Sequence, residues 1–301
     1  MKRKSSIVIL LGLTVLATLL AAVLLLTNPF ARAAPEFDGS RAYEDIQTQL
    51  GFGPRTPGSE GHDQVIEWIA GELEGSDWDV EVQEISASGF PARNIIAKRS
   101  AAPGDPWVIL GAHYDTRFAS DKDPDPNKRG EPVPGANDGA SGVAALLELA
   151  RVLPTDLDKK VWLVFFDEED NGNIANRTWA MGSAAFVDSL TQHPDEVVIL
   201  DMIGDADLNI YLEKNSDPLL SGEIWAQAAA LGYLDRFIPI PKYSMVDDHT
   251  PFVRAGIRAV DIIDFDYPYH HTTADTIDKV SAESLDAVGE TILAWLTTPE
   301  D

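Results

Sequence analysis

The sequence has 301 residues, 45% of them hydrophobic, no cysteine and a formal net charge of −26. It is long and apolar enough to bury the core of one α/β domain. The absence of cysteine excludes disulfides, thiolate metal ligands, a cysteine nucleophile and a lipoprotein anchor. The negative charge argues against nucleic acid or an anionic membrane surface as a partner and favours cationic peptides.

The chain begins with a basic and then apolar segment. Three basic residues precede an uncharged apolar run over residues 7–26, which is long enough to span a bilayer at about 1.5 Å per residue. Small residues follow at 31–34, as at a signal-peptidase site. We expect residues 1–34 to be a signal peptide or a membrane anchor, with the anchor slightly favoured. Residues 35–301 are then an exported catalytic domain, secreted or tethered outside the cytoplasm, that touches a membrane only through an uncleaved anchor.

Apolar periodicity predicts helices and strands throughout this domain. Helices are expected at 42–50, 65–73, 143–150, 181–190 and 219–231, in a short segment after Asp248, and in a final helix that Ser281 caps. Strands are expected at 80–85, 94–99, 108–115, 161–166, 197–204, 209–213 and 257–264. Strands that alternate with helices indicate an α/β fold.

Four of the predicted strands end in acids or histidines. The run at 161–166 leads directly into Asp167, Glu168, Glu169 and Asp170; the others lead to His113 and Asp115, to Asp201, and through Asp264 to His270 and His271. In an open α/β sheet, ligands bind outside the carboxyl ends of the strands, so these side chains should converge. Histidine and carboxylate ligands without cysteine suit zinc or a similar divalent ion.

Two turns carry further polar residues. PGANDGASG places Asn137 and Asp138 just before the helix at 143–150. In the loop at 116–135, alternating aspartates at 121, 123 and 125 look like calcium ligands, but the glycine and distal glutamate of an EF-hand are missing. We therefore expect a solvated acidic loop there.

Six sequence blocks in order resemble the zinc aminopeptidases related to aminopeptidase Y and their relatives, the glutaminyl-peptide cyclotransferases. The blocks are GAHYDTR, PGANDGASG, FFDEEDNG, LDMIG, DDHTPF and HHTTADT, and the resemblance extends from Gly53 to Leu296. It implies the fold of a zinc exopeptidase, which is a single α/β domain with a mixed, mostly parallel central sheet flanked by helices. It also implies one or two zinc ions and the free N-termini of peptides as substrates.

The resemblance assigns roles by position. The implied ligands are Asp138 as a bridging carboxylate, His113 and Asp201 for one zinc, and Asp170 and His271 for the other. The family block has two acids, one residue and then glycine, so Gly172 aligns the pair as Glu169 and Asp170. Glu169 is thereby implied as the general base. Asp170 stands where the family usually has glutamate, and its shorter side chain changes the reach to the metal.

One such site can serve two reactions, because both need a polarised amide carbonyl and a carboxylate that moves a proton to the leaving nitrogen. In an aminopeptidase the nucleophile is water, whereas in a cyclotransferase the α-amine of an N-terminal glutamine attacks its own γ-amide. Asp247 resembles the acid that joins the Asp201 counterpart in a carboxylate network of cyclotransferases, so we favour cyclisation, with Asp247 and Asp201 assisting Glu169. Aminopeptidase action is the alternative. The cyclotransferases also have tryptophan where this chain has His270.

Other residues of these blocks are expected to orient ligands or contact substrate: Asp115, Asp248, His249, Tyr267 and His270. Asp248 and His249 either bind substrate or cap the helix that follows. Tyr267, with Tyr269, either walls the site or packs in the core. Glu168 is expected to face solvent or to support the site.

A function of another class is a catalytically inert, membrane-tethered binding ectodomain on the same scaffold. Such a protein is expected to lose a metal ligand or the general base. Every one of those positions is filled here, so an enzyme is the better interpretation.

Overall fold

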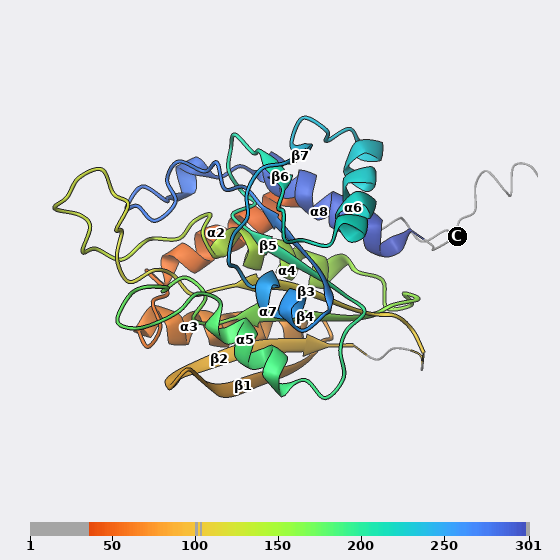
Figure 1. Cartoon of the computed structure of the whole chain (residues 1–301), viewed down its shortest axis with the longest axis horizontal. Coiled ribbons are helices and arrows are strands. Elements are labelled where there is room, and N and C mark those ends of the chain that lie inside the picture. Colours follow the sequence, from red (N-terminus) through yellow and green to blue (C-terminus); the bar gives the residue numbers. More distant parts are fainter. Residues whose placement is uncertain (1–35, 100–101, 103, 299–301) are drawn as a thin grey trace, which may run out of the picture. The chain divides into compact units, whose positions relative to one another are not determined.

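The computed structural model describes residues 36–99, 102 and 104–298, and the predictions for residues 1–34 lie outside this part of the chain. A six-stranded sheet forms its centre (Figure 1). The strand order is β1 (Asp79–Ala87), β2 (Phe90–Lys98), β4 (Lys160–Phe166), β3 (Trp107–His113), β5 (Glu196–Asp201) and β8 (Arg258–Ile263). The last four strands of that order are parallel, and β2 is antiparallel to both of its neighbours. This confirms the predicted mixed, mostly parallel α/β sheet.

Burial explains the strand sequences. All residues of β3 are buried, and those of β5 are buried except the first, as expected for parallel strands that helices cover on both faces. The edge strand β1 instead has mostly exposed or half-buried residues, which matches its alternation of polar and apolar residues. The apolar runs therefore mark the central strands, and the acids that follow them lie at the carboxyl ends of those strands.

Helices cover both faces of the sheet (Figure 1). One large core cluster joins the sheet to α2 (Gly39–Gly51), α3 (Glu60–Gly75), α4 (Ala140–Val152), α6 (Pro218–Leu231) and α8 (Ala282–Thr297). A smaller cluster on the other face includes Phe186 of α5 (Met181–Ser189) and Phe252 of α7 (His249–Arg254). The predicted helices are all present, and Ser281 caps α8 by accepting a hydrogen bond from the Ser284 amide. A short 3₁₀-helix, η1 (Ile277–Lys279), precedes α8.

A second, two-stranded parallel sheet pairs β6 (Ile210–Leu212) with β7 (Phe237–Pro241). The strand β7 was not predicted, because its sequence FIPIP contains two prolines, which disfavour a strand. Among the described residues, no helix combines the length and the hydrophobicity that crossing a bilayer requires.

The helix α4 lies unusually close to the sheet at Gly142. A Cβ atom at this position would lie 2.1 Å from the Leu200 carbonyl oxygen of β5 and 2.9 Å from the Cβ of Ala112 in β3. Because α4 begins just after Asp138, this close approach also sets the distance between Asp138 and the ends of β3 and β5.

We expect Gly142→Ala to lower the free energy of unfolding by about 1–3 kcal/mol, because the helix must move away from the sheet. Gly71→Ala is the matched control, since Gly71 lies on the exposed side of α3 and an added methyl group would have no atom within 4 Å. It should instead stabilise by up to about 1 kcal/mol. Thermal unfolding followed by circular dichroism measures both, and equal shifts for the two variants would contradict this account of α4.

Candidate active site

The carboxyl ends of β3, β4, β5 and β8 lead into one pocket of about 420 Å³. Its acidic and histidine lining residues are Asp121, Asp138, Glu169, Asp170, Asp201, Asp247, His270 and His271. The chain thus brings together segments that are up to about 150 residues apart in sequence, as the positions of the strand ends in a parallel sheet require.

His113 lies at the bottom of the site between two aspartates. Its Nε2 atom is 3.2 Å from Asp138 Oδ1 and 3.2 Å from Asp201 Oδ1. Its Nδ1 atom lies 3.5 Å from Asp115 Oδ1 on the other side of the ring. Burial alone would lower the pKa of His113, but Asp201 and the other two carboxylates outweigh it and raise that pKa well above its usual value.

Asp138 also faces the second histidine. Its Oδ2 atom is 3.7 Å from His271 Nε2, and the same nitrogen lies 2.7 Å from Asp170 Oδ1. The Oδ2 atoms of Asp138 and Asp170 are buried and have no hydrogen-bond partner among the described residues. Asp138 therefore lies between His113 and His271 and turns one oxygen toward each.

This donor set fits a divalent metal. Ligand atoms of His113, Asp138 and Asp201 lie within 4.8 Å of one another, and so do those of Asp138, His270 and His271. Buried carboxylate oxygens without a partner are unfavourable unless a cation neutralises them. Nitrogen and oxygen ligands in groups of three or four match zinc.

Asp115 holds two parts of the site together. Beside its contact with His113, its carboxylate accepts hydrogen bonds from the Glu169 amide at 3.0 Å, the Asp170 amide at 3.4 Å and the Asn171 side chain at 3.1 Å. One buried side chain thus fixes the turn that presents Glu169 and Asp170 and lies 3.5 Å from His113 Nδ1, and its role in orienting a ligand stays a prediction. Burial and the neighbouring Asp247 raise the pKa of Glu169 well above its usual value.

Two residues that support Asp138 were missed from the sequence. Asp275 accepts hydrogen bonds from the amides of Asn137 at 2.9 Å and Asp138 at 3.1 Å. The fully buried Arg55 donates to three carbonyl oxygens, including Gly135 O at 2.6 Å. Asp275 belongs to the block HHTTADT, which was a usable signal, whereas nothing in GPRTPG distinguished Arg55.

The aromatic wall of the pocket differs from the expected one. Tyr267 is buried and donates to Asp275 Oδ1 at 2.6 Å, and Tyr269 packs beside it, so neither lines the pocket. The wall is formed by Trp179, which is stacked on His271 with ring centroids 5.8 Å apart, and by Phe265. Of the two alternatives for the tyrosines, packing is the one that the structure shows.

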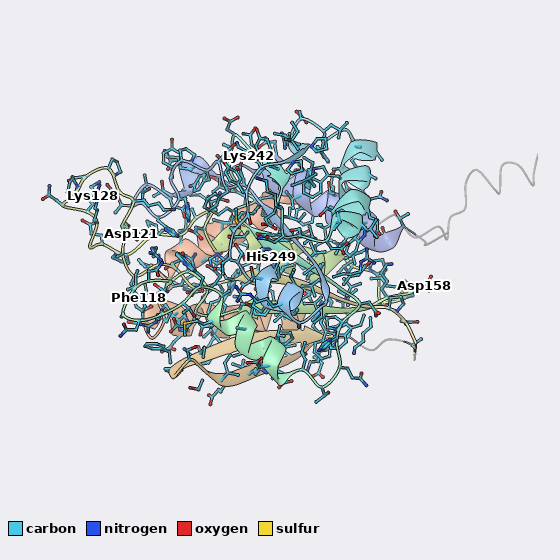
Figure 2. The ribbon with its side chains drawn as sticks, viewed as in Figure 1. Phe118, Asp121, Lys128, Asp158, Lys242 and His249 are labelled. Carbon is cyan, nitrogen blue, oxygen red and sulfur yellow. The ribbon has the colours of Figure 1, made fainter. Side chains whose placement is uncertain are left out.

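Asp247 and its neighbours have different surroundings. Asp247 and Asp201 both line the pocket, whereas Asp248 and His249 do not. Burial and the charge of Asp201 raise the pKa of Asp247 to about 7. Asp248 is the N-cap residue of α7, but its side chain makes no capping hydrogen bond. His249, labelled in Figure 2, is fully buried between Glu213 at 3.3 Å and Asp261 at 3.4 Å. The structure therefore does not show the capping alternative for Asp248, and substrate binding by these two residues stays a prediction.

Two other acidic residues are buried. Glu168 is only 1% exposed and pairs with Arg177 at 2.8 Å, which excludes the solvent-facing one of its two alternatives. Asp123 of the acidic loop is also buried and accepts hydrogen bonds from the amide and the hydroxyl of Thr273. The prediction of a solvated loop was wrong at Asp123, because its carboxylate ties the loop to the segment that carries His271.

A known protein family shares the part of the chain that builds this pocket. Residues 94–296 match the family model described as Peptidase family M28. The chain belongs to this family. The match covers β3, β4, β5 and β8 and every residue placed in the pocket above.

Solved structures of similar proteins include both activities that the sequence left open. The glutaminyl cyclase of Tannerella forsythia is 33% identical, with a TM-score of 0.82, over 88% of this chain and 100% of that one. A Zn-dependent exopeptidase of Parabacteroides distasonis is 31% identical, with a TM-score of 0.83, over 89% and 100%. Aminopeptidase YwaD of Bacillus subtilis is 30% identical over 200 residues, which are 62% of this chain. The chain spans 40% of the length of that aminopeptidase, and 60% of an uncharacterized Escherichia coli relative, YfbL.

The comparisons thus show the family of the chain, and the proteins similar to it include a glutaminyl cyclase, an aminopeptidase and a Zn-dependent exopeptidase.

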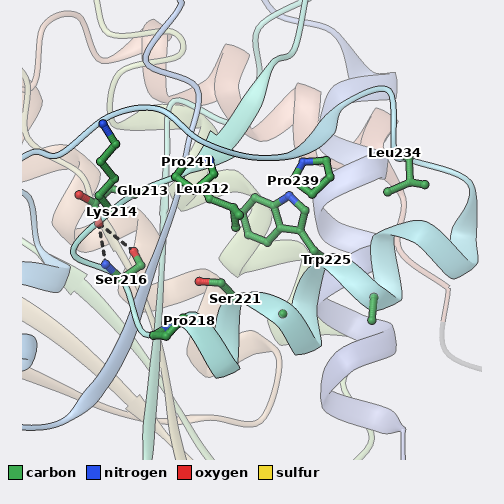
Figure 3. Close-up of a pocket in the computed structure, with 12 residues that line it drawn as sticks. Leu212, Glu213, Lys214, Ser216, Pro218, Ser221, Trp225, Leu234, Pro239 and Pro241 are labelled. Carbon is green, nitrogen blue, oxygen red and sulfur yellow. Dashed lines mark hydrogen bonds between the residues drawn. The ribbon is translucent and has the colours of Figure 1, made fainter.

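A second pocket, of about 500 Å³, lies between α6 and the β6–β7 sheet and is mostly apolar (Figure 3). Trp225, Leu234 and Pro239 line it, and Glu213 at its edge accepts hydrogen bonds from Ser216. None of the candidate catalytic residues or metal ligands lines this pocket. Its size alone therefore does not make it the catalytic site.

We expect Asp275→Ala to weaken zinc binding by about 10–100-fold, because the amides of Asn137 and Asp138 lose the carboxylate that fixes their turn. Competition with a fluorescent zinc chelator measures the affinity. Asp278→Ala is the control, since Asp278 is exposed and lies three residues further on. Equal zinc affinity in Asp275→Ala and the wild type would show that the turn keeps Asp138 in place without this carboxylate.

Proposed function

We propose that this M28 enzyme is a zinc-dependent glutaminyl-peptide cyclotransferase, exported through residues 1–34, that converts N-terminal glutamine into pyroglutamate and releases ammonia. The observation that carries the proposal is that Asp247 and Asp201 line the same pocket as Glu169. The similarity to a glutaminyl cyclase along nearly the whole length of both chains supports it.

Zinc, when bound, polarises the amide carbonyl of the substrate. The residues that would hold one or two ions are His113, Asp138, Asp170, Asp201 and His271. The buried, unpartnered Oδ2 atoms of Asp138 and Asp170 are the observation that supports this assignment.

Glu169 is proposed to move the proton in the reaction. The α-amine nitrogen of the substrate forms a bond to the γ-amide carbon, and the bond from that carbon to the amide nitrogen breaks. Glu169 takes a proton from the attacking amine and gives it to the departing ammonia. Because Asp115 holds the Glu169 amide at 3.0 Å, the carboxylate is presented to the pocket from a fixed turn.

The neighbouring acids and aromatics assist by position. Asp247, which lines the pocket together with Asp201, is proposed to accept a hydrogen bond from the substrate amine. Trp179 and Phe265 form the wall that excludes water from one side of the pocket. Exclusion of water favours attack by the amine of the substrate over hydrolysis.

Aminopeptidase action is the second candidate, because an aminopeptidase and a Zn-dependent exopeptidase are also similar to this chain. The two reactions differ in nucleophile and product but use the same Glu169. Analysis of the products therefore distinguishes the two reactions, whereas loss of activity in a Glu169 variant does not.

We expect purified residues 35–301 with zinc to convert a peptide that begins with glutamine to a product lighter by one ammonia, and to leave a peptide that begins with leucine intact. Glu169→Gln should lower kcat by about 10²–10⁴, because the side chain no longer accepts the proton. Mass spectrometry of both peptides measures this. Release of free leucine would make the protein an aminopeptidase, and no change in either peptide would favour the inert binding ectodomain.

We also expect removal of metal to destabilise the fold, because the acids of the pocket lose their counter-ion. Dialysis against a chelator should lower the melting temperature of the wild type, and added zinc should restore it. His271→Ala is the comparison, since it removes a ligand in advance and should reduce the shift. A melting temperature that the chelator leaves unchanged in the wild type would argue against a bound metal.

A further inference from the structure

Two basic side chains line the catalytic pocket, and they differ in their contacts. Arg117 donates to the Asp170 carbonyl oxygen at 2.7 Å and makes two hydrogen bonds with the carboxylate of Asp121. It also stacks on Trp179, with the guanidinium carbon 4.9 Å from the ring centroid. Arg117 is therefore occupied by the wall of the pocket.

Lys122 has no such acidic partner. Its Nζ atom lies 2.9 Å from His270 Nδ1, and no ion pair joins it to a carboxylate within 4.0 Å in the described part of the chain. The ammonium donates this hydrogen bond to the imidazole nitrogen, because a lysine side chain has donors and no acceptor. A pocket-lining ammonium without a carboxylate partner can still bind an anion.

Aromatic contacts hold this pair at the rim. The Phe265 ring meets the His270 ring edge to face with centroids 5.2 Å apart, and Lys122 Nζ lies 5.7 Å from the centroid of Phe265. On its other side, His270 Nε2 is 3.8 Å from Asp138 Oδ2. One imidazole ring thus separates the Lys122 ammonium from the carboxylate at the centre of the site.

We propose that Lys122 forms an anion subsite that selects substrates with a carboxylate just beyond the reacting N-terminal residue. This inference rests on the proposed function, which places that residue beside Asp138. Consecutive Cα atoms are about 3.8 Å apart, so a group on the second residue lies within reach of Lys122. The carboxylate is either the side chain of an acidic second residue or the C-terminus of a dipeptide.

Because the surroundings of the subsite are acidic, the binding of an anionic substrate depends on Lys122. The other ionisable groups of the pocket, apart from Arg117 and the two histidines, are all acidic: Asp121, Asp138, Glu169, Asp170, Asp201 and Asp247. Together with the net charge of −26, these acids repel an anionic substrate. The overall charge favours cationic peptides, and Lys122 reverses that preference at one position.

The test compares kcat/KM for glutamine peptides that differ only in this carboxylate. One pair is Gln-Glu-Ala amide and Gln-Ala-Ala amide, which tests the acidic side chain. The other pair is the dipeptide Gln-Ala and its amide, which tests the terminal carboxylate. We expect the wild type to prefer the anionic member of at least one pair by about fivefold, mainly through KM, with a preference that weakens as salt is raised.

Variants assign that preference to the lysine. Lys122→Met should bring the ratio within the preferred pair to one or below, and Lys122→Arg should keep it above one. Lys128→Met is the matched control, because Lys128 lies at the outer end of the same loop, away from the pocket (Figure 2). This control should keep the wild-type ratio.

Three results overturn the subsite: no preference in the wild type, an unchanged ratio in Lys122→Met, or an equal loss in Lys128→Met. If the leucine peptide is the true substrate, the same pairs are made with N-terminal leucine. If the wild type converts no peptide, the proposed function fails, and calorimetric binding of the same peptides tests the subsite alone. Tighter binding of the anionic peptide to the wild type than to Lys122→Met then supports it, and equal binding overturns it.

Discussion

The site depends on the position of Asp138 between two histidines. Its two oxygens face His113 at 3.2 Å and His271 at 3.7 Å, so a small movement of its backbone would disturb both halves of the site. Two features of the surrounding structure restrain that backbone. The helix α4 packs tightly on β3 and β5, and Asp275 accepts the Asn137 and Asp138 amides. The packing that forms the core of the α/β fold therefore also sets the geometry of the site.

The concentration of buried acids imposes a second constraint. The carboxylates of Asp138, Asp170 and Asp201 are nearly inaccessible to water and lie within one pocket, and their charges repel one another. Backbone and side-chain donors satisfy other acids, such as Asp115 and Asp275, but leave one oxygen each of Asp138 and Asp170 without a partner. These two pocket-facing oxygens therefore remain open to a cation.

Much of this architecture was predictable, because parallel strands have continuous apolar sequences and end at a common edge. The acids and histidines at the ends of β3, β4 and β5 were identified on that basis, and the structure brings them together. Arg55 gave no comparable pattern, because it binds carbonyl oxygens of a turn that is distant in sequence. The strand β7 was missed because its prolines disfavour a strand. The solvated loop predicted around Asp123 was wrong at that residue, and the sequence left open whether Glu168 is exposed or buried. Their partners, Arg177 and Thr273, are brought to them by tertiary structure, which local sequence does not specify.

Three residues at or beside the candidate site residues have strained backbone conformations. His271 itself, Glu168 just before the Glu169–Asp170 pair, and Met202 just after Asp201 all have left-handed backbone conformations, with φ values of 57°, 53° and 46°. Such conformations cost about 1–2 kcal/mol for a residue with a side chain, so they persist only where other contacts fix them. Glu168 is held by its ion pair with Arg177, and His271 by its 2.7 Å contact with Asp170 and its stacking on Trp179. These three residues are, or adjoin, His271, Asp201 and the Glu169–Asp170 pair, so the contacts that fix their backbones also fix the turns from which the candidate residues enter the pocket.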